Sequence, residues 1–300
     1  MLIALSFAGA AQLTAQDAPE KAAPRAAFVE TIPRADVSIE MVPVTIAADD
    51  AADNTLWVSS REITWNAYDA FVFELDKAFG DESSDADAVV RPSKPYGLAD
   101  YGFGRNGYPV ISVSHQGAEA FCTWLSELSG KRYRLPTEAE WDALAAVSGP
   151  EWLASERRRA LREHAHLAPA ARARTHPVGT LPADANGLHD LFGNVAEWCS
   201  DADGKPVLKG GSFQTDVDSF ELNWRATPTP AWNQRDPQIP KSPWWLSDAP
   251  FAGFRIVCEA APDAGADSAS TDAEPQKPTD TRNANAPAGS RDATATEDTP

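Results

Sequence analysis

Cysteine is scarce in this chain, and long apolar runs are absent. The 300 residues include three cysteines, Cys122, Cys199 and Cys258, which allow at most one intramolecular disulfide. Their spacing is not that of a zinc finger, and their number leaves the redox compartment undecided. Because no run of about 18 apolar residues occurs, the sequence excludes an ordinary transmembrane helix.

Positive charge is also scarce, with 26 Lys and Arg against 44 Asp and Glu and a formal net charge of −18. Such a chain is poorly suited to neutralising a phosphate backbone, so we expect no nucleic-acid partner. Residues 260–300 contain no aromatic residue and no Leu, Ile, Val or Met. A segment that cannot bury apolar surface cannot offset its ordering entropy, which predicts a disordered, acidic Pro/Ala-rich tail.

The first residues have some features of an export signal. A short apolar stretch runs from Leu2 to Ala11, and Ala8, Gly9 and Ala10 give the small-x-small pattern of a cleavage site. The basic residues that normally precede such a stretch are missing. We expect residues 1–35 to be an atypical leader and linker, and the protein to be exported from a bacterium-like cell to the periplasm or the medium.

Residues 36–259 carry the patterns of one folded domain. Apolar residues nearly alternate from Val37 to Ile46, which is typical of strands. Thr64 is a suitable N-cap for a helix whose apolar stripe extends from Trp65 to Leu75. After His176 the turn residues Gly and Pro become frequent, which predicts short strands joined by ordered loops. The fold class expected is α+β.

Capping residues mark two further helices. Ser114 and Gly130 bracket an apolar stripe that includes Cys122. On that stripe Cys122 is better explained as a small core residue than as a reactive thiol, because no neighbour would stabilise its thiolate. Thr137 and Glu140 form the S/T-x-x-E pattern of a capping box, so a third helix should begin there.

Tryptophan is concentrated near the C-terminal end of this domain. Of the ten tryptophans, Trp224, Trp232, Trp244 and Trp245 all precede Phe254 within a short stretch. Large amphipathic rings on a loop-rich surface often form a binding floor, but in a strand-poor domain they also serve as the core. Both interpretations stay open at this stage.

Four strings, Arg134–Trp141, Gly187–Trp198, Gly210–Phe213 and Gly253–Arg255, occur in one order along the chain. In sequence and spacing they resemble the formylglycine-generating enzyme, or sulfatase-modifying factor, family over about Val37–Val257. The resemblance implies the formylglycine-generating-enzyme fold, an elaborated C-type-lectin-like α+β domain with few regular strands and much ordered loop.

The resemblance also implies a chemistry that depends on two cysteines. Members of the family that make formylglycine bind Cu(I) through two cysteines after the Gly-Gly-Ser turn, and oxidise a substrate cysteine of a sulfatase with dioxygen. Counting forward from Gly210, the corresponding positions here are Thr215 and Phe220. Cu(I) prefers thiolate ligands, which a hydroxyl and a phenyl ring cannot replace. We therefore expect no bound copper. Three roles stay open for Cys199 and Cys258: they could be replacement copper ligands, a disulfide pair or separate core thiols.

The family's calcium chemistry has a better match. Asp190, Gly193, Val195 and Glu197 correspond to positions that bind calcium in relatives through two side-chain oxygens and two backbone carbonyls. Ca²⁺ favours such oxygen donors. The alternative is that Asp190 and Glu197 only satisfy turn amides. We expect calcium here, and no second calcium site, because the corresponding segment, Glu151–Arg174, is rich in Arg and Ala.

Three functions follow from these patterns, and whether the chain is an enzyme stays open. The first is an exported, catalytically silent relative, with no catalytic residue assigned, whose Trp-rich loop surface binds a peptide, protein or glycan. Aromatic and Arg side chains contribute most contact energy in interfaces. The second is an oxidase of a substrate cysteine with an altered metal site, and the third is a structural spacer. The candidate contact residues are Ser212, Trp224, Arg225, Trp244, Trp245 and Asp248.

Overall fold

The computed structural model describes residues 25–46, 54–78, 91–94, 99–148 and 157–259. The predicted acidic tail and the apolar start of the predicted leader lie outside these residues. Within the described part of the chain, no helix has both the length and the apolar character needed to cross a bilayer.

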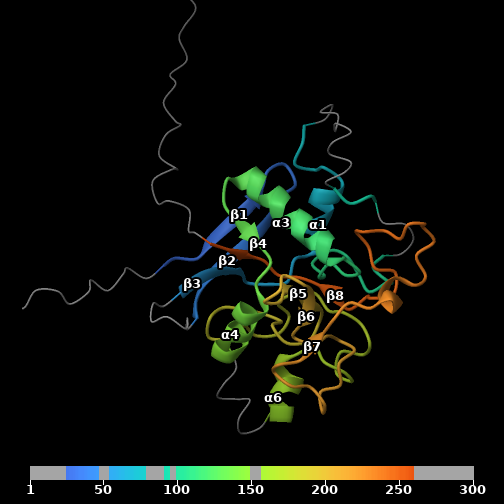
Figure 1. The fold of residues 1–300 in the computed structure, drawn as a ribbon. Helices are drawn as coiled ribbons and strands as arrows, with labels where there is room; N and C mark the ends of the chain where they lie inside the picture. Colours follow the sequence, from blue (N-terminus) through green and yellow to red (C-terminus); the bar gives the residue numbers. More distant parts are fainter. Residues whose placement is uncertain (1–24, 47–53, 79–90, 95–98, 149–156, 260–300) are drawn as a thin grey trace, which may run out of the picture. The chain divides into compact units, whose positions relative to one another are not determined.

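A five-stranded antiparallel sheet contains the N-terminal strands (Figure 1). Its order is β1-β2-β3-β9-β4, so the last strand of the chain is inserted between the third and the fourth. This insertion places the C-terminal end of the domain inside the sheet, next to the edge strand β4. The strands are β1 (Phe28–Ile32), β2 (Val37–Ile46), β3 (Asn54–Ser59), β9 (Val257–Cys258) and β4 (Tyr133–Arg134).

Strand β1 lies before residue 36, where the sequence predicted that the folded domain starts. It pairs with β2 from Phe28 opposite Met41 to Ile32 opposite Val37. The sequence pattern hid this strand because one of its inward positions is Glu30, which is buried and accepts hydrogen bonds from the Tyr133 hydroxyl and, at 2.8 Å, from Lys131 Nζ. A buried carboxylate interrupts the apolar alternation by which a strand is recognised.

A second, four-stranded sheet has the order β7-β6-β5-β8. Strands β5 and β8 are parallel, and the other pairs are antiparallel. Most of the residues that carry the family resemblance lie in this sheet or in the loops that surround it. The strands are β7 (Arg225–Ala226), β6 (Pro206–Lys209), β5 (Ala196–Ser200) and β8 (Ala252–Gly253).

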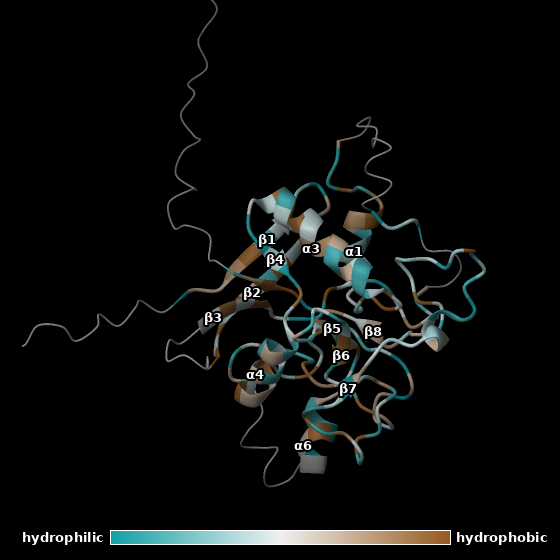
Figure 2. Ribbon diagram, in the orientation of Figure 1, coloured by the Kyte–Doolittle hydropathy of each residue, from teal (hydrophilic) through white to brown (hydrophobic). Residues whose placement is uncertain are grey.

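Four α-helices and one 3-10 helix are described. The predicted stripe from Trp65 to Leu75 is helical only as far as Val72. Helices α1 and α3 carry hydrophilic and hydrophobic colours side by side in Figure 2, as expected for helices with one buried face. The helices are α1 (Trp65–Val72), α3 (His115–Ser129), α4 (Glu138–Ser148), α6 (Arg157–His164) and the 3-10 helix η1 (Pro230–Asn233).

The predicted caps are confirmed. Ser114 Oγ accepts a hydrogen bond from the Gly117 amide at 3.0 Å, and Gly130 ends α3 in the left-handed conformation. At the start of α4, Thr137 Oγ1 accepts from the Glu140 amide at 3.1 Å, and Glu140 Oε2 accepts from the Thr137 amide at 2.9 Å. Each helix therefore begins where its local sequence satisfies the first amides.

The interior consists of two groups of apolar side chains. In the first, Tyr68 of α1 and Phe121 of α3 meet Phe254 at ring separations of 5.9 and 5.5 Å. Phe71 of α1 packs against Tyr68 and Phe121 at 5.7 and 5.9 Å. In the second, Trp141 of α4 packs with rings from the loops around the second sheet. The candidate site residues are divided between the two groups: Val195 and Trp245 belong to the first, and Phe220 belongs to the second.

Candidate functional site

Thr215 and Phe220, the positions where the resemblance predicts copper ligands, lie in the loop after β6. Thr215 Oγ1 accepts a hydrogen bond from the Ser212 amide at 2.9 Å. Phe220 is 1% exposed and packs edge-on against Phe192, with ring centroids 5.8 Å apart. Gly211 has a φ of +69°, and a Cβ there would lie 3.0 Å from the Phe220 ring and 3.2 Å from Thr215 Oγ1. The loop is therefore closely packed around an aromatic ring.

The three cysteines lie in the core, away from this loop in sequence. None of them forms a disulfide, so the proposed Cys199–Cys258 bridge is absent, and all three are buried. Burial raises the pKa of the Cys122 and Cys199 thiols well above the ordinary value. Since the thiolate is the metal ligand and the nucleophile, both side chains behave as neutral core residues at physiological pH.

A buried arginine, Arg255, is bonded to one carboxylate and lies near two others. Glu197 of β5 and Arg255 have no solvent exposure. Arg255 Nε donates to both Glu197 oxygens at 2.7 Å, and its terminal nitrogen lies 2.7 Å from Oε1. Trp141 Nε1 adds a hydrogen bond of 2.8 Å to Glu197 Oε2. Glu197 is thus held from two sides.

Two further carboxyl groups surround this pair. Asp190 Oδ2 accepts from the Gly179 amide at 2.6 Å, whereas its Oδ1 has no hydrogen-bond partner among the described residues. Glu62 accepts from Asn194 Nδ2 at 2.6 Å and from the Val195 amide at 3.0 Å. Burial raises the pKa of both carboxyl groups, and repulsion from neighbouring carboxylates adds to the increase.

This arrangement fits the predicted calcium donors unequally. Asp190 is buried and accepts a hydrogen bond at Oδ2 only, and the nearest group to its Oδ1 is the His166 imidazole, with Nε2 at 4.0 Å. A buried carboxylate oxygen without a hydrogen bond is a candidate donor to a cation. Both oxygens of Glu197 already accept hydrogen bonds from Arg255 and Trp141. Gly193 and Val195 lie between these two residues in the same loop and strand start, so their carbonyls are the remaining candidates. Calcium binding stays a prediction.

The predicted contact residues do not form one exposed surface. Ser212 is 3% exposed and Trp245 is 5% exposed, so both belong to the interior. Trp224 and Trp244 are half-buried and pack against the first apolar group. For Trp245 the core interpretation of the tryptophans is therefore correct, and for Ser212 the buried position rules out direct surface contact in this conformation.

The two charged contact residues belong to separate networks. Arg225 of β7 is paired with Glu138 at 2.8 Å and with Asp201 at 3.3 Å. Asp248 accepts from the Arg235 amide at 2.8 Å and also pairs with the Arg235 guanidinium. These hydrogen bonds outweigh the effect of burial and hold the pKa of Asp248 at about 2.

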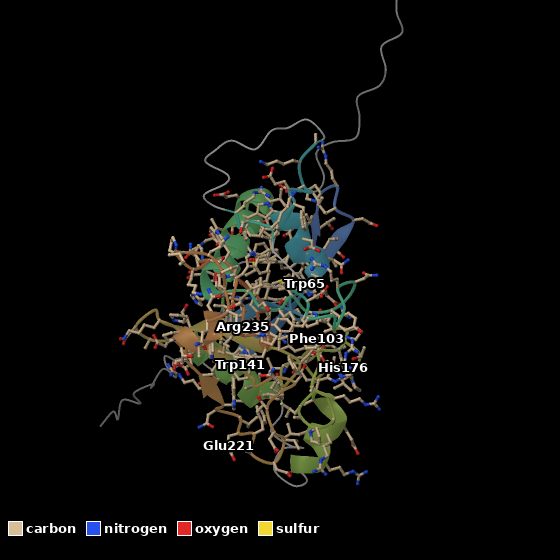
Figure 3. The ribbon with its side chains drawn as sticks, turned by 90° about the vertical axis from the view of Figure 1, so that its right-hand side faces the viewer. Trp65, Phe103, Trp141, His176, Glu221 and Arg235 are labelled. Carbon is tan, nitrogen blue, oxygen red and sulfur yellow. The ribbon has the colours of Figure 1, made fainter. Side chains whose placement is uncertain are left out.

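An aromatic and arginine patch near Asp248 was not predicted from the sequence. Arg235 donates to the Tyr101 hydroxyl at 3.3 Å, and the Tyr101 ring stacks on Phe103 with centroids 6.0 Å apart. Phe103 in turn meets the edge of Phe213, the residue after Ser212, at 5.4 Å. Figure 3 labels Phe103 and Arg235 at similar heights in the middle of the molecule. The segment that contains Tyr101 has the composition of a polar loop, so the patch is revealed by the long-range contacts of the Tyr101 hydroxyl with Arg235 and with the Ser247 carbonyl. We call Tyr101, Phe103, Arg235 and Asp248 the Tyr101 patch.

Comparisons with known proteins agree with this fold. The model of the sulfatase-modifying factor enzyme 1-like domain matches residues 25–237. The chain is 32% identical to the formylglycine-generating enzyme of Streptomyces coelicolor in an alignment of 122 positions that covers 36% of this chain and 37% of that enzyme. It is 32% identical to the formylglycine-generating enzyme of Bos taurus in an alignment of 192 positions that covers 54% of this chain and 46% of that enzyme.

A shorter match joins the chain to a protein with another name. It is 36% identical over 96 residues, 31% of this chain, to 14% of the serine/threonine-protein kinase pkn1 of Chlamydia caviae. In each of these relatives the chain spans less than half of the relative's length.

Solved structures show the same fold at low sequence identity. Treponema denticola variable protein 1 aligns with a TM-score of 0.55 and 20% identity over 79% of this chain and 100% of that one. PvdO from Pseudomonas aeruginosa aligns with a TM-score of 0.52 and 19% identity over the same shares. The α+β fold expected from the sequence is confirmed, and the chain belongs to the sulfatase-modifying factor enzyme 1-like domain family.

Proposed function

We propose that this chain is a binding module built on an oxidase fold, and that it does not oxidise cysteine. The observation that carries the proposal is the burial of Phe220, an aromatic ring packed against Phe192 where the resemblance predicts the second copper ligand. Its ligand would be a peptide, protein or glycan, and export would follow from the apolar start of the chain. An oxidase with an altered metal site is the alternative.

The chemistry of copper supports the proposal that this chain does not oxidise cysteine. Cu(I) requires soft sulfur ligands, and the loop after β6 supplies a hydroxyl that is already hydrogen-bonded and a phenyl ring in the core. The cysteines of the chain are buried, and burial keeps Cys122 and Cys199 protonated. None of the three belongs to the loop in which relatives place their copper ligands.

The Tyr101 patch and the half-buried tryptophans support a binding role. Their positions are fixed by contacts between loops, such as the hydrogen bond from the Leu246 amide to the Ser112 carbonyl at 2.8 Å. The side chain of Arg235 remains 69% exposed while its partners hold it in place. A surface whose aromatic and Arg side chains are ordered before binding loses less entropy when a partner arrives.

The test compares the wild type with a variant that restores the missing ligands. Copper(I) affinity is measured by competition with a chromogenic chelator, and oxygen consumption is measured with a cysteine peptide. We expect neither stoichiometric copper nor turnover from the wild type. The Thr215→Cys/Phe220→Cys variant should gain copper binding if it folds, and circular dichroism checks its fold because loss of a buried Phe costs about 3–5 kcal/mol.

The outcome for the wild type alone decides the proposal. Stoichiometric copper together with conversion of the peptide thiol to an aldehyde would replace it with the altered-site oxidase. Absence of both supports it, and the variant then shows whether Thr215 and Phe220 occupy the positions assigned to them.

A further inference from the structure

Three side chains from α3 and β5 lie next to one another outside the site described above. His115 is the first residue of α3, Glu119 is one turn later on the same helix, and Ser200 is the last residue of β5. Glu119 Oε2 lies 3.3 Å from His115 Nδ1, and Ser200 Oγ lies 3.3 Å from His115 Nε2. The imidazole therefore bridges a carboxylate and a serine hydroxyl through its two nitrogens.

This connectivity assigns a role to each group. A carboxylate beside Nδ1 keeps the proton on that nitrogen, which leaves the Nε2 lone pair directed at the hydroxyl. A serine whose proton is accepted by a histidine, itself oriented by a carboxylate, is the general arrangement of an activated nucleophile. We propose that Ser200 is a nucleophile toward small acyl esters, with His115 as its general base and Glu119 as a positioning residue.

The surroundings of His115 suit a base. Its side chain is 12% exposed, and the ring meets the Trp198 ring edge-to-face at 5.6 Å, which fixes its plane. Burial lowers the pKa of His115, and this effect outweighs the opposite influence of Glu119. A neutral imidazole can accept a proton at neutral pH. Ser200 is half-buried rather than enclosed in the core.

Aromatic rings lie beside the three residues. Trp198 meets Trp232 at 6.1 Å, and Trp232 meets Phe251 at 5.3 Å. Trp232 is only half-buried and offers an apolar contact for the acyl or alcohol part of an ester. These contacts define the substrate class as small esters with an apolar group rather than highly charged ones.

The N-terminal end of α4 also lies beside Ser200. Thr137, which caps that helix, forms a parallel bridge with Ser200, and the Ser200 amide donates to the Pro136 carbonyl at 3.2 Å. The positive end of a helix favours negative charge that develops nearby. The acidic residues of the first turn are paired with cations, Glu138 with Arg225 at 2.8 Å and Glu140 with Arg134 at 2.7 Å.

The reaction needs no reagent other than water. Ser200 Oγ attacks the ester carbonyl while its proton passes to His115 Nε2; the carbon–oxygen bond to the alcohol then breaks, and the alcohol leaves with that proton. Water attacks the resulting acyl-serine with His115 again as the base. The acid is released and Ser200 regains its proton.

A fluorophosphonate probe tests the nucleophile directly, because attack forms an oxygen–phosphorus bond and expels fluoride. Folded wild-type protein is treated with the probe, and the adduct is located by peptide mass spectrometry. We expect the adduct on Ser200, a loss of labelling in Ser200→Ala, and a labelling rate at least about 100-fold lower in His115→Gln. Ser219→Ala is the matched control, because Ser219 is exposed and its hydroxyl donates to the Asp216 carbonyl.

Hydrolysis of p-nitrophenyl acetate supplies the second readout. The rate should rise as His115 loses its proton, with a midpoint below the ordinary histidine pKa, since Glu119, Ser200 and Trp198 are the groups in contact with the ring. Glu119→Gln should slow turnover and move this midpoint further down, and Glu119→Asp should restore part of both.

Each outcome decides the proposal. Absence of a Ser200 adduct in folded wild-type protein overturns it, whether or not the variants fold. Equal labelling of wild type and His115→Gln also overturns it, because the histidine would then be only a helix-surface partner of Glu119. Neither result bears on copper binding, so failure here is distinct from failure of the proposed function.

Discussion

Arg255 carries a positive charge inside the protein, where its side chain has no solvent exposure. Burial by itself would lower the pKa of its guanidinium, but attraction by Glu197, Glu62 and Asp190 raises it above the ordinary value. A buried ion pair is not a large net gain in stability, yet removal of one partner leaves the other charge uncompensated. The buried charge of Glu197 therefore depends on Arg255 for its compensation.

Replacement of Arg255 should be strongly destabilising. Arg255→Met should lower the free energy of unfolding by about 3–5 kcal/mol, because Glu197 would remain buried without its cation. Urea denaturation measures the change. The additional change Glu197→Gln should recover part of the loss, and Arg235→Met, which breaks an exposed pair, is the control and should change the midpoint little. Similar losses for Arg255→Met and Arg235→Met would contradict the argument.

At the scale of the element, α4 is fixed at its start by charge as well as by capping. Arg134 reaches both oxygens of Glu140 at 2.7 Å, while one of these oxygens also accepts from the Thr137 amide. Burial would raise the pKa of Glu140, but these hydrogen bonds outweigh it and lower the pKa below the ordinary value. A carboxyl group with a lowered pKa in the folded state stabilises the protein above its unfolded pKa.

The contribution of Glu140 should disappear in acid. Glu140→Gln keeps the shape of the capping box and removes the charge, so wild type and variant should differ most at about pH 6 and converge as the pH falls through the pKa of Glu140 in the folded protein. The free energy of unfolding of both proteins is measured at a series of pH values from about pH 6 down to below the pKa of Glu140 in the folded protein. Glu163→Gln, which breaks the exposed pair with Arg159, is the control. A difference that stays constant with pH would show that charge has no part in fixing this helix.

At the scale of the whole molecule, the surplus of buried carboxyl groups has a consequence for ion binding. The predicted calcium donors lie between Asp190 and Glu197, and Glu62, which precedes α1, bonds this segment through Asn194 and the Val195 amide. A bound ion would therefore stabilise a contact between segments far apart in sequence. An ion that binds only the folded state stabilises it by mass action, by about 2.7 kcal/mol at 100 times its dissociation constant.

Calcium should therefore raise the melting temperature, and a chelator should lower it. Asp190→Ala should not respond to either addition, because it removes the unpartnered oxygen on which the prediction depends. Differential scanning fluorimetry with calcium, with magnesium and with chelator measures the response. A wild-type melting curve that is the same under all three conditions would contradict the predicted calcium site.

The helix starts and the family membership follow from the sequence alone. Thr137 and Glu140 lie three positions apart, and Ser114 bonds an amide three residues later, so these contacts form within one turn whatever the rest of the chain does. The strings around Gly210 and Glu197 are likewise continuous in sequence. Interactions of this kind depend on spacing, which a sequence displays directly.

The tertiary structure decided the features that join distant residues. The burial of Glu30 in β1 depends on its partner Tyr133, which lies 103 positions away, so the sequence pattern did not indicate this strand. The pairing of His115 with Ser200 likewise spans 85 positions. Whether Trp245 is core or surface depends on which loops cover it, and Glu197 acquires its cation from Arg255, 58 positions later. Burial and charge pairing are properties of the packed chain, so residue type and spacing indicate the available groups, whereas packing determines which of them meet.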